Sequence, residues 1–316
     1  MSEGNANWRI GLEEPDAEVK RQHRRRAPVP STSASIDQFR SFYASYMATV
    51  ARQPSWPRGY AFQARLEGAF EAVPREMFLP PGPWLIEAGL GGYIETPNAD
   101  VRFIYQDVLV AIDKNRGIDN GQPSRHAQFM GRLEPRPGEN LVHIGAGTGY
   151  YSAILSMLVA PGGRVAAFEF HEDLALRARL NLQTLDNVCV TAGDATALRL
   201  PEADVIYVNA GIISPPAHWL SALGPGGRMF LPWRPAGDIG IAVFISRTAR
   251  GFSVTPAMPA WFIPCIGASS SSSGDKPPDV RSAWASRALY LKAQRKPDAT
   301  ATAIYDEVWF SSERPS

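Results

Sequence analysis

Three glycines at alternate positions are the residues of this 316-residue chain whose spacing points most directly to chemistry. Gly145, Gly147 and Gly149 follow the apolar run 141–144 and precede a run with helical spacing at 152–158. Glycine tolerates positive φ and lets a ligand approach the backbone closely. A helix that begins there offers free N–H groups and a positive dipole end to an anionic group. The pattern therefore predicts a strand, a tight turn and a helix that form a nucleotide-type pocket.

Two acidic residues strengthen this interpretation. Glu169 ends a second predicted strand, 20 positions after Gly149, where a doubly wound sheet carries the acid that binds ribose hydroxyls. Asp194 follows Gly193 just beyond a third predicted strand. A dinucleotide fingerprint would need its third glycine at position 150, which is Tyr150, so the ligand need not carry a pyrophosphate.

The glycine turn resembles motif I of the class I methyltransferases that use S-adenosylmethionine. Within that class the chain resembles the protein-L-isoaspartate O-methyltransferase family, from about residue 73 to residue 233. The segments that carry the resemblance are Val73-Pro74-Arg75-Glu76-Met77-Phe78, Tyr105-Gln106-Asp107, the 145–151 loop, Glu169, Gly193-Asp194, and Gly224-Pro225-Gly226-Gly227-Arg228 with Pro232. The resemblance implies an α/β fold, namely a Rossmann-like doubly wound sheet with an N-terminal helical layer and a C-terminal strand extension.

The resemblance also implies a cofactor, S-adenosyl-L-methionine, with S-adenosyl-L-homocysteine as the product. We expect Glu169 to bind the ribose, Asp194 to bind the adenine amino group, and the 145–149 backbone to hold the methionine part. His143 stands where many methyltransferases carry an acid, and we interpret it as a structural support rather than a catalytic base. The full set of expected cofactor-binding residues is His143, Gly145, Ala146, Gly147, Gly149, Tyr150, Glu169, Phe170, Gly193, Asp194, Ala195 and Asn209.

The acceptor side departs from the family pattern. In the family, a loop ends in Ser-x-Pro before a helix, and its serine helps to hold the substrate carboxylate. Here the loop reads Gln122-Pro123-Ser124, with Gly121 or Gln122 in place of that serine. Gln122, Ser124 and Asn209 are the expected catalytic residues, which position the acceptor, and the expected substrate contacts are Tyr105, Asp107, Gln122, Ser124 and His126.

Two of these residues also have purely structural interpretations. Ser124 is a possible N-cap of the helix that follows it, and Asp107 is equally a solvated or capping residue at a strand end.

Methyl transfer to a carboxylate makes few chemical demands on a protein. A carboxylate is already ionised at neutral pH, so the reaction needs no general base. The protein mainly has to align donor and acceptor and to exclude water. The leading hypothesis is a carboxyl O-methyltransferase that acts on an (iso)aspartyl-type carboxylate of a protein or peptide. The alternatives are a dedicated peptide or natural-product O-methyltransferase of the same fold, and a non-catalytic adaptor that binds S-adenosylmethionine.

Four regions are expected along the chain. Residues 1–33 read as a disordered basic tail, 34–134 as an N-terminal helical region with the substrate cleft, 135–268 as the cofactor domain, and 269–316 as a flexible loop with a C-terminal extension. Periodicity predicts helices at 36–50, 61–70 and 172–185 and strands at 239–245 and 261–266, whereas 81–98 reads as loop.

Composition restricts the remaining possibilities. A net charge of +1 predicts no nucleic-acid partner. Cys189 and Cys265 give no disulfide framework, and we expect both to be buried. No cluster has metal-ligand spacing, and no apolar run of about 18 residues predicts a membrane span. We expect a cytoplasmic protein, and the sequence leaves its oligomeric state open.

Overall fold

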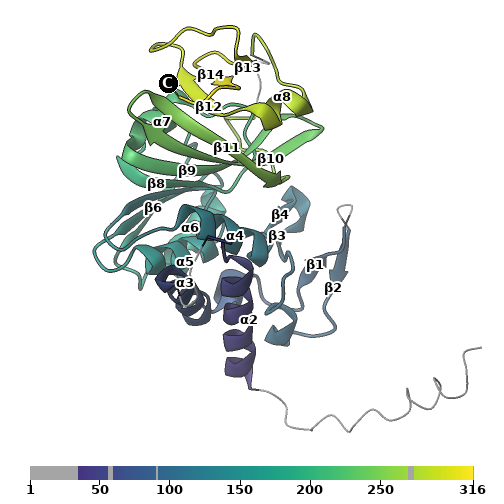
Figure 1. Ribbon diagram of the computed structural model, residues 1–316. Coiled ribbons are helices and arrows are strands. Elements are labelled where there is room, and N and C mark those ends of the chain that lie inside the picture. Colours follow the sequence, from purple (N-terminus) through teal and green to yellow (C-terminus); the bar gives the residue numbers. More distant parts are fainter. Residues whose placement is uncertain (1–34, 56–59, 90–91, 270–273, 316) are drawn as a thin grey trace, which may run out of the picture. The chain divides into compact units, whose positions relative to one another are not determined.

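A ten-stranded sheet organises the fold (Figure 1). The structure is a computed structural model that describes residues 35–55, 60–89, 92–269 and 274–315, so the predicted tail at 1–33 lies outside the described residues. The strand order is β13-β14-β12-β11-β10-β9-β8-β5-β6-β7. These strands are β5 (Asn140–Ile144), β6 (Arg164–Glu169), β7 (Val188–Ala192), β8 (Ala203–Val208), β9 (Leu223–Ala236), β10 (Ile239–Thr248), β11 (Gly251–Pro259), β12 (Ala288–Leu291), β13 (Ala301–Ile304) and β14 (Val308–Ser311).

The sheet has a parallel half and an antiparallel half. The parallel pairs are β7–β6, β6–β5, β5–β8 and β8–β9. The pairs from β9–β10 onward are antiparallel. The chain runs outward from β5 to β7 and then returns to the other side of β5 as β8. Because ligands of open α/β sheets bind where the strand order reverses, this topology places a crevice at the carboxyl ends of β5 and β8. The doubly wound sheet and its C-terminal strand extension are confirmed, and Figure 1 shows the extension in yellow beyond β11.

Alternating side chains of the parallel strands feed two cores. In β5, Leu141 joins the core beneath the N-terminal helices, whereas Val142 and Ile144 join the core on the opposite face. This alternation follows from the period of two in a strand. The helices that accompany the sheet are α2 (Ile36–Val50), α3 (Ala61–Ala72), α4 (Pro123–Leu133), α5 (Tyr150–Val159), α6 (Glu172–Asn181), α7 (Ala217–Ala222) and α8 (Val280–Ala285).

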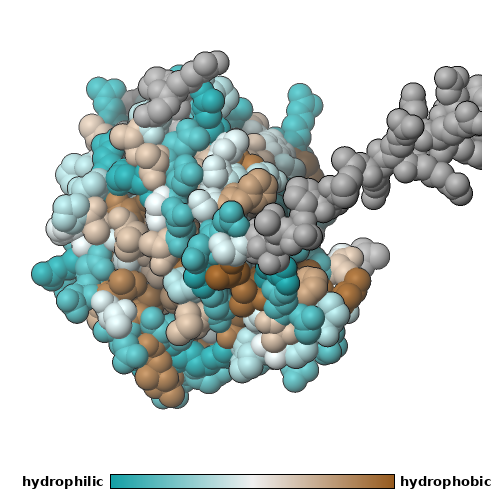
Figure 2. All heavy atoms as spheres, turned by 90° about the horizontal axis from the view of Figure 1, so that it is seen from below, coloured by the Kyte–Doolittle hydropathy of each residue, from teal (hydrophilic) through white to brown (hydrophobic). Residues whose placement is uncertain are grey.

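The N-terminal layer consists of α2, α3 and short elements held together by one buried arginine. Arg75 is fully buried, and its guanidinium donates to backbone carbonyls of Ile104 and Val108 and to the side chain of Asn120. It thereby fixes the loops that precede α4. The short elements are η1 (Arg75–Phe78), η2 (Val101–Phe103), η3 (Lys114–Arg116), β1 (Leu85–Glu87), β2 (Tyr93–Glu95), β3 (Ala111–Asp113) and β4 (Ile118–Asp119). On the face seen in Figure 2, hydrophobic and hydrophilic residues are interspersed.

Several predictions of local structure were wrong. The 81–98 segment is not all loop, because β1 and β2 pair there as an antiparallel ladder. The helix predicted at 172–185 ends at Asn181. Cys189 is exposed, because it lies on β7, the edge strand of the sheet, whereas Cys265 is buried as expected. Among the described residues, no helix combines the length and the apolar character that crossing a membrane requires.

Candidate active site

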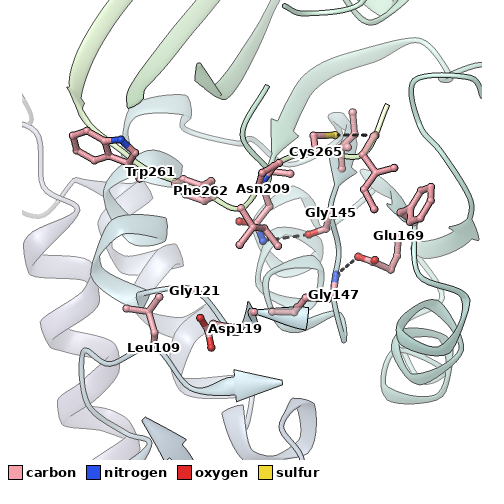
Figure 3. A pocket seen from close by; sticks show the side chains of 18 of the residues that line it. Leu109, Asp119, Gly121, Gly145, Gly147, Glu169, Asn209, Trp261, Phe262 and Cys265 are labelled. Atoms are coloured by element: carbon pink, nitrogen blue, oxygen red, sulfur yellow. Dashed lines mark hydrogen bonds between the residues drawn. The ribbon is translucent and has the colours of Figure 1, made fainter. Parts of the chain in front are cut away.

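A cavity of about 720 Å³ opens at the carboxyl ends of β5, β6 and β8. One part of its wall comes from the glycine turn and from the ends of β6 and β7. The other part comes from the segments before α4 and from residues 259–266. Figure 3 shows Gly147 and Glu169 on one side and Leu109, Asp119 and Gly121 on the other. Asn209 lies between the two groups, beside Gly145. The cavity is large enough for a cofactor and part of an acceptor.

The glycine turn is built as the sequence predicts. Gly145, Gly147 and Gly149 have φ values of 80°, 56° and 97°, which side chains with a Cβ rarely adopt. A Cβ on Gly149 would also lie 2.8 Å from Leu182. At Gly147 the nearest atom to such a Cβ is 3.7 Å away, so this part of the turn has open space beside it. The turn therefore leaves its backbone accessible from the cavity.

Glu169 is tied to the glycine turn and still faces the cavity. Its Oε2 accepts from the Gly147 amide at 2.7 Å (Figure 3). Its Oε1 accepts from the His171 amide at 2.9 Å. Each oxygen keeps a lone pair for a hydroxyl donor. Burial raises the pKa of Glu169, while the two amides oppose that rise. This geometry fits a carboxylate that binds two vicinal hydroxyls.

Asp194 and its neighbours line the same wall. Its Oδ1 accepts from the amide and the hydroxyl of Thr196 at 2.8 and 2.7 Å, which orients the carboxylate. Gly193, which precedes it, has a φ of 136° and donates its amide to the Glu169 carbonyl. Phe170 and Ala195, which were predicted to bind the cofactor, also line the cavity.

Four other residues predicted to bind the cofactor do not line the cavity. Ala146 and Gly149 shape the turn through their backbones, and Tyr150 is buried with its hydroxyl 3.2 Å from that of Tyr43. His143 is fully buried, and its Nδ1 lies 2.8 Å from the Ser152 hydroxyl. Burial lowers the pKa of His143 to about 3, so the ring is neutral. This buried, neutral ring agrees with the interpretation of His143 as a structural support for the glycine turn.

One wall of the cavity, the 260–268 segment, was not predicted from the sequence. It was predicted to contain a strand at 261–266, but its only strand-type pairing among the described residues is a single bridge between Gly211 and Pro264. The Gly211 amide donates to Ile263, and the Cys265 amide donates back to Gly211, both at 2.7 Å. A short apolar run in the sequence is equally consistent with a buried strand and with a buried loop. Only the prolines at 259 and 264 argue against a strand here.

The 260–268 segment contributes apolar groups to the cavity. Trp261, Phe262, Cys265 and Ile266 line it, and Trp261 is exposed. Burial raises the pKa of Cys265 to about 12, so its thiol stays protonated at neutral pH. The segment therefore gives the cavity an apolar wall and does not supply a nucleophile.

On the acceptor side, Asp107 acts within the protein. Its Oδ1 accepts from the Ser124 amide and its Oδ2 from the Gln122 side chain, both at 2.8 Å. The N-cap of α4 is Gln122 rather than Ser124, so the predicted Ser124 cap was wrong. Asp107 and Ser124 do not line the cavity, whereas Gln122 and His126 do. Asp107 thus fixes the start of α4.

Tyr105 also lies away from the cavity. Its hydroxyl accepts from Arg40 at 3.0 Å and donates to Glu76, within the N-terminal layer. Burial and the neighbouring Glu76 raise its pKa. In the structure, Tyr105 joins α2 to the Val-Pro-Arg-Glu segment and makes no contact with the cavity.

The reversal of strand order, the glycine turn and the acids beyond β6 and β7 together define the fold of a class I S-adenosylmethionine-dependent methyltransferase. The protein-L-isoaspartate(D-aspartate) O-methyltransferase family model matches residues 93–270, which is more than half of the chain. The chain belongs to this family. The family, enzyme class and cofactor expected from the sequence are thereby confirmed.

Individual relatives agree with this membership. The protein-L-isoaspartate O-methyltransferase of Aeropyrum pernix is 32% identical over 215 residues, which cover 66% of this chain and 75% of the relative. The Methanopyrus kandleri protein of the same name is 34% identical over 179 residues, which cover 55% and 71%.

Solved structures show the same fold. A protein-L-isoaspartate O-methyltransferase superposes with a TM-score of 0.60 at 20% identity and covers 86% of this chain and 88% of its own. A Plasmodium falciparum protein, described as a beta-aspartate methyltransferase in complex with S-adenosyl-L-homocysteine, gives 0.55 at 15% identity and covers 72% and 97%. At these identities the structural likeness shows the fold alone.

Proposed function

We propose that this protein transfers a methyl group from S-adenosylmethionine to an (iso)aspartyl-type carboxylate of a protein or peptide. The observation that carries the proposal is the position of Glu169, whose carboxylate is held by two amides at the edge of the cavity. It supplies paired acceptors for the ribose hydroxyls beside an open glycine turn. We propose the cytoplasm as the location of this activity.

The residues present fit the cofactor. Glu169 would hold the ribose, Asp194 the adenine amino group, and the backbone from Gly145 to Gly147 the methionine part. The cofactor supplies an electrophilic methyl group on a sulfonium. Phe262 and Cys265 line the cavity with apolar surface and exclude water from the reaction.

Transfer requires no proton movement. An oxygen of the ionised carboxylate forms a bond to the methyl carbon as the sulfur–methyl bond breaks, so the carboxylate charge and the sulfonium charge are both neutralised. The protein therefore has to align the groups in line and to keep water out. Asn209 separates the two sides of the cavity, and its side chain donates to the Gly145 carbonyl at 3.2 Å (Figure 3). We assign Asn209 the role of holding the glycine turn in place beside the acceptor.

A dedicated peptide or small-molecule acceptor is a second candidate, because Gly121 or Gln122 stands where the resembled family carries a serine. The exposed Trp261 at the cavity also offers a flat apolar surface that a particular acceptor could use.

A labelling experiment tests the proposal. The protein is incubated with methyl-labelled S-adenosylmethionine and an isoaspartyl peptide, with the matched aspartyl peptide as the control. Base-labile label on the isoaspartyl peptide alone is the expected result. Cofactor binding without label on either peptide would contradict the isoaspartyl assignment and favour the dedicated acceptor.

A further inference from the structure

Each polar group expected to receive the acceptor already makes a hydrogen bond inside the protein. The Ser124 amide and the Gln122 side chain both donate to Asp107, and the Asn209 side chain donates to Gly145. The amides of Arg125 and His126 donate to the Gln122 carbonyl. The N-terminus of α4 therefore already binds a carboxylate, that of Asp107, and does not offer these amides to a second one.

A hydroxyl at position 121 is also ruled out by packing. A Cβ built on Gly121 would lie 2.2 Å from His126 Nε2, so the imidazole occupies the space of a side chain there. The imidazole is held by Tyr207, whose hydroxyl is 2.7 Å from Nδ1, and it stacks on Tyr151 with ring centroids 3.7 Å apart. Burial lowers the pKa of His126 well below its usual value, so the ring carries no charge for an anionic acceptor.

Arg125 is the cationic donor on this turn of α4 that faces the cavity. Its side chain is exposed and lines the cavity. Its Nη1 lies 3.1 Å from Met258 Sδ, and a thioether is only a weak acceptor. Across the described part of the chain, no carboxylate forms an ion pair with this guanidinium.

The position of Arg125 has no explanation in helix stability. It lies in the first turn of α4, where the helix dipole favours acidic residues and disfavours cations. The helix dipole favours a cation in the last turn, where Arg132 lies. A guanidinium presents five N–H donors in a rigid fork and binds carboxylates well.

We propose that Arg125 binds the carboxylate of the acceptor and determines its charge specificity. The inference rests on the proposed function, and it names the group that takes over from the missing serine. The guanidinium engages one carboxylate oxygen and leaves the other to accept the methyl group. A neutral acceptor gains nothing from this contact.

Peptide binding tests this inference apart from catalysis. The full-length protein is saturated with S-adenosyl-L-homocysteine, and binding of a fluorescent isoaspartyl peptide is followed by anisotropy. Arg125→Gln should raise the Kd for the peptide about tenfold, in line with the loss of a charged hydrogen bond, and Arg125→Lys should fall between it and the wild type. Arg132→Gln, on the same helix but outside the cavity, is the matched control and should bind as the wild type does.

A second peptide makes the readout specific to charge. With asparagine in place of the isoaspartyl residue, the wild type and Arg125→Gln should bind equally weakly. Equal affinity of the wild type and Arg125→Gln for the isoaspartyl peptide would overturn the inference, as would a loss seen only in Lys114→Gln, the other exposed cation at the cavity.

The two proposals fail in different ways. Peptide binding that depends on Arg125 but gives no methyl transfer would contradict the proposed function and support the role of Arg125. Methyl transfer that does not depend on Arg125 would support the proposed function and contradict the role of Arg125. A wild type that does not bind the peptide would remove both.

Discussion

The imidazole of His126 takes the place of a side chain at residue 121: a Cβ on Gly121 would meet Nε2 at 2.2 Å. With the imidazole in this position, only glycine fits at residue 121. The buried Nε2 has no hydrogen-bond partner among the described residues, so the imidazole fills space without anchoring the loop through that atom. The packing of His126 is therefore a physical reason for glycine at residue 121 of the acceptor loop.

Gly121→Ala should destabilise the protein by about 1–3 kcal/mol, because it overpacks a site already filled by His126. Chemical denaturation measures this change. The double variant Gly121→Ala/His126→Ala should cost less than the sum of its single variants, since removing the imidazole makes room for the Cβ. Gly68→Ala is the matched control: no atom lies within 4 Å of its Cβ on the exposed face of α3, and it should be neutral or slightly stabilising. Additive effects in the double variant would contradict the pairing.

Acid should destabilise the fold through its buried neutral histidines. The pKa of His143 is about 3 in the folded protein, against an ordinary value of 6.5. Between these values only the unfolded chain takes up the proton, so stability is present above pH 6.5 and is lost as the pH falls below it. For His143 this linkage costs about 2 kcal/mol at pH 5.

The measurement is the free energy of unfolding between pH 5 and pH 7. His143→Asn, which keeps a partner for Ser152, should show a shallower slope than the wild type. An identical slope in the two proteins would mean that His143 does not titrate as its burial requires.

Cofactor affinity should depend on the ionisation of Glu169. Burial raises its pKa, so the carboxylate gains its proton at a pH above the ordinary value of 4.5. The ionised form accepts two ribose hydroxyls, whereas the protonated form has lost part of that capacity. Affinity for S-adenosyl-L-homocysteine should therefore fall as the pH is lowered toward that pKa, within the range where the protein stays folded. Glu169→Gln should bind more weakly and without this pH dependence; a parallel pH profile would argue against the role.

Much of the cofactor half could be predicted because its signals are local in sequence. The apolar run before Gly145 predicts β5, and the position of Glu169 after the next strand follows from the regular length of a βαβ unit. These elements carry their own periodicity and turn residues, and the structure places them as expected.

The acceptor half could not be predicted in the same way, because its contacts join distant residues. Asp107 reaches Ser124 across 17 positions, and no pattern in the sequence shows that it occupies the start of α4. The 260–268 segment lacks a distinguishing period and lies over Gly211 only after the sheet has formed. Arg125 could have been noticed from sequence as a cation in the first turn of a helix.

Calorimetric titration with S-adenosyl-L-homocysteine tests the central claim most directly, namely that the cavity beside Glu169 is the cofactor site. The wild type should bind one equivalent, and Glu169→Ala should lose at least about tenfold in affinity through the lost charged hydrogen bonds. Glu172→Ala, an exposed neighbour outside the cavity, should bind as the wild type does. Unchanged binding in Glu169→Ala would contradict the assignment of the site.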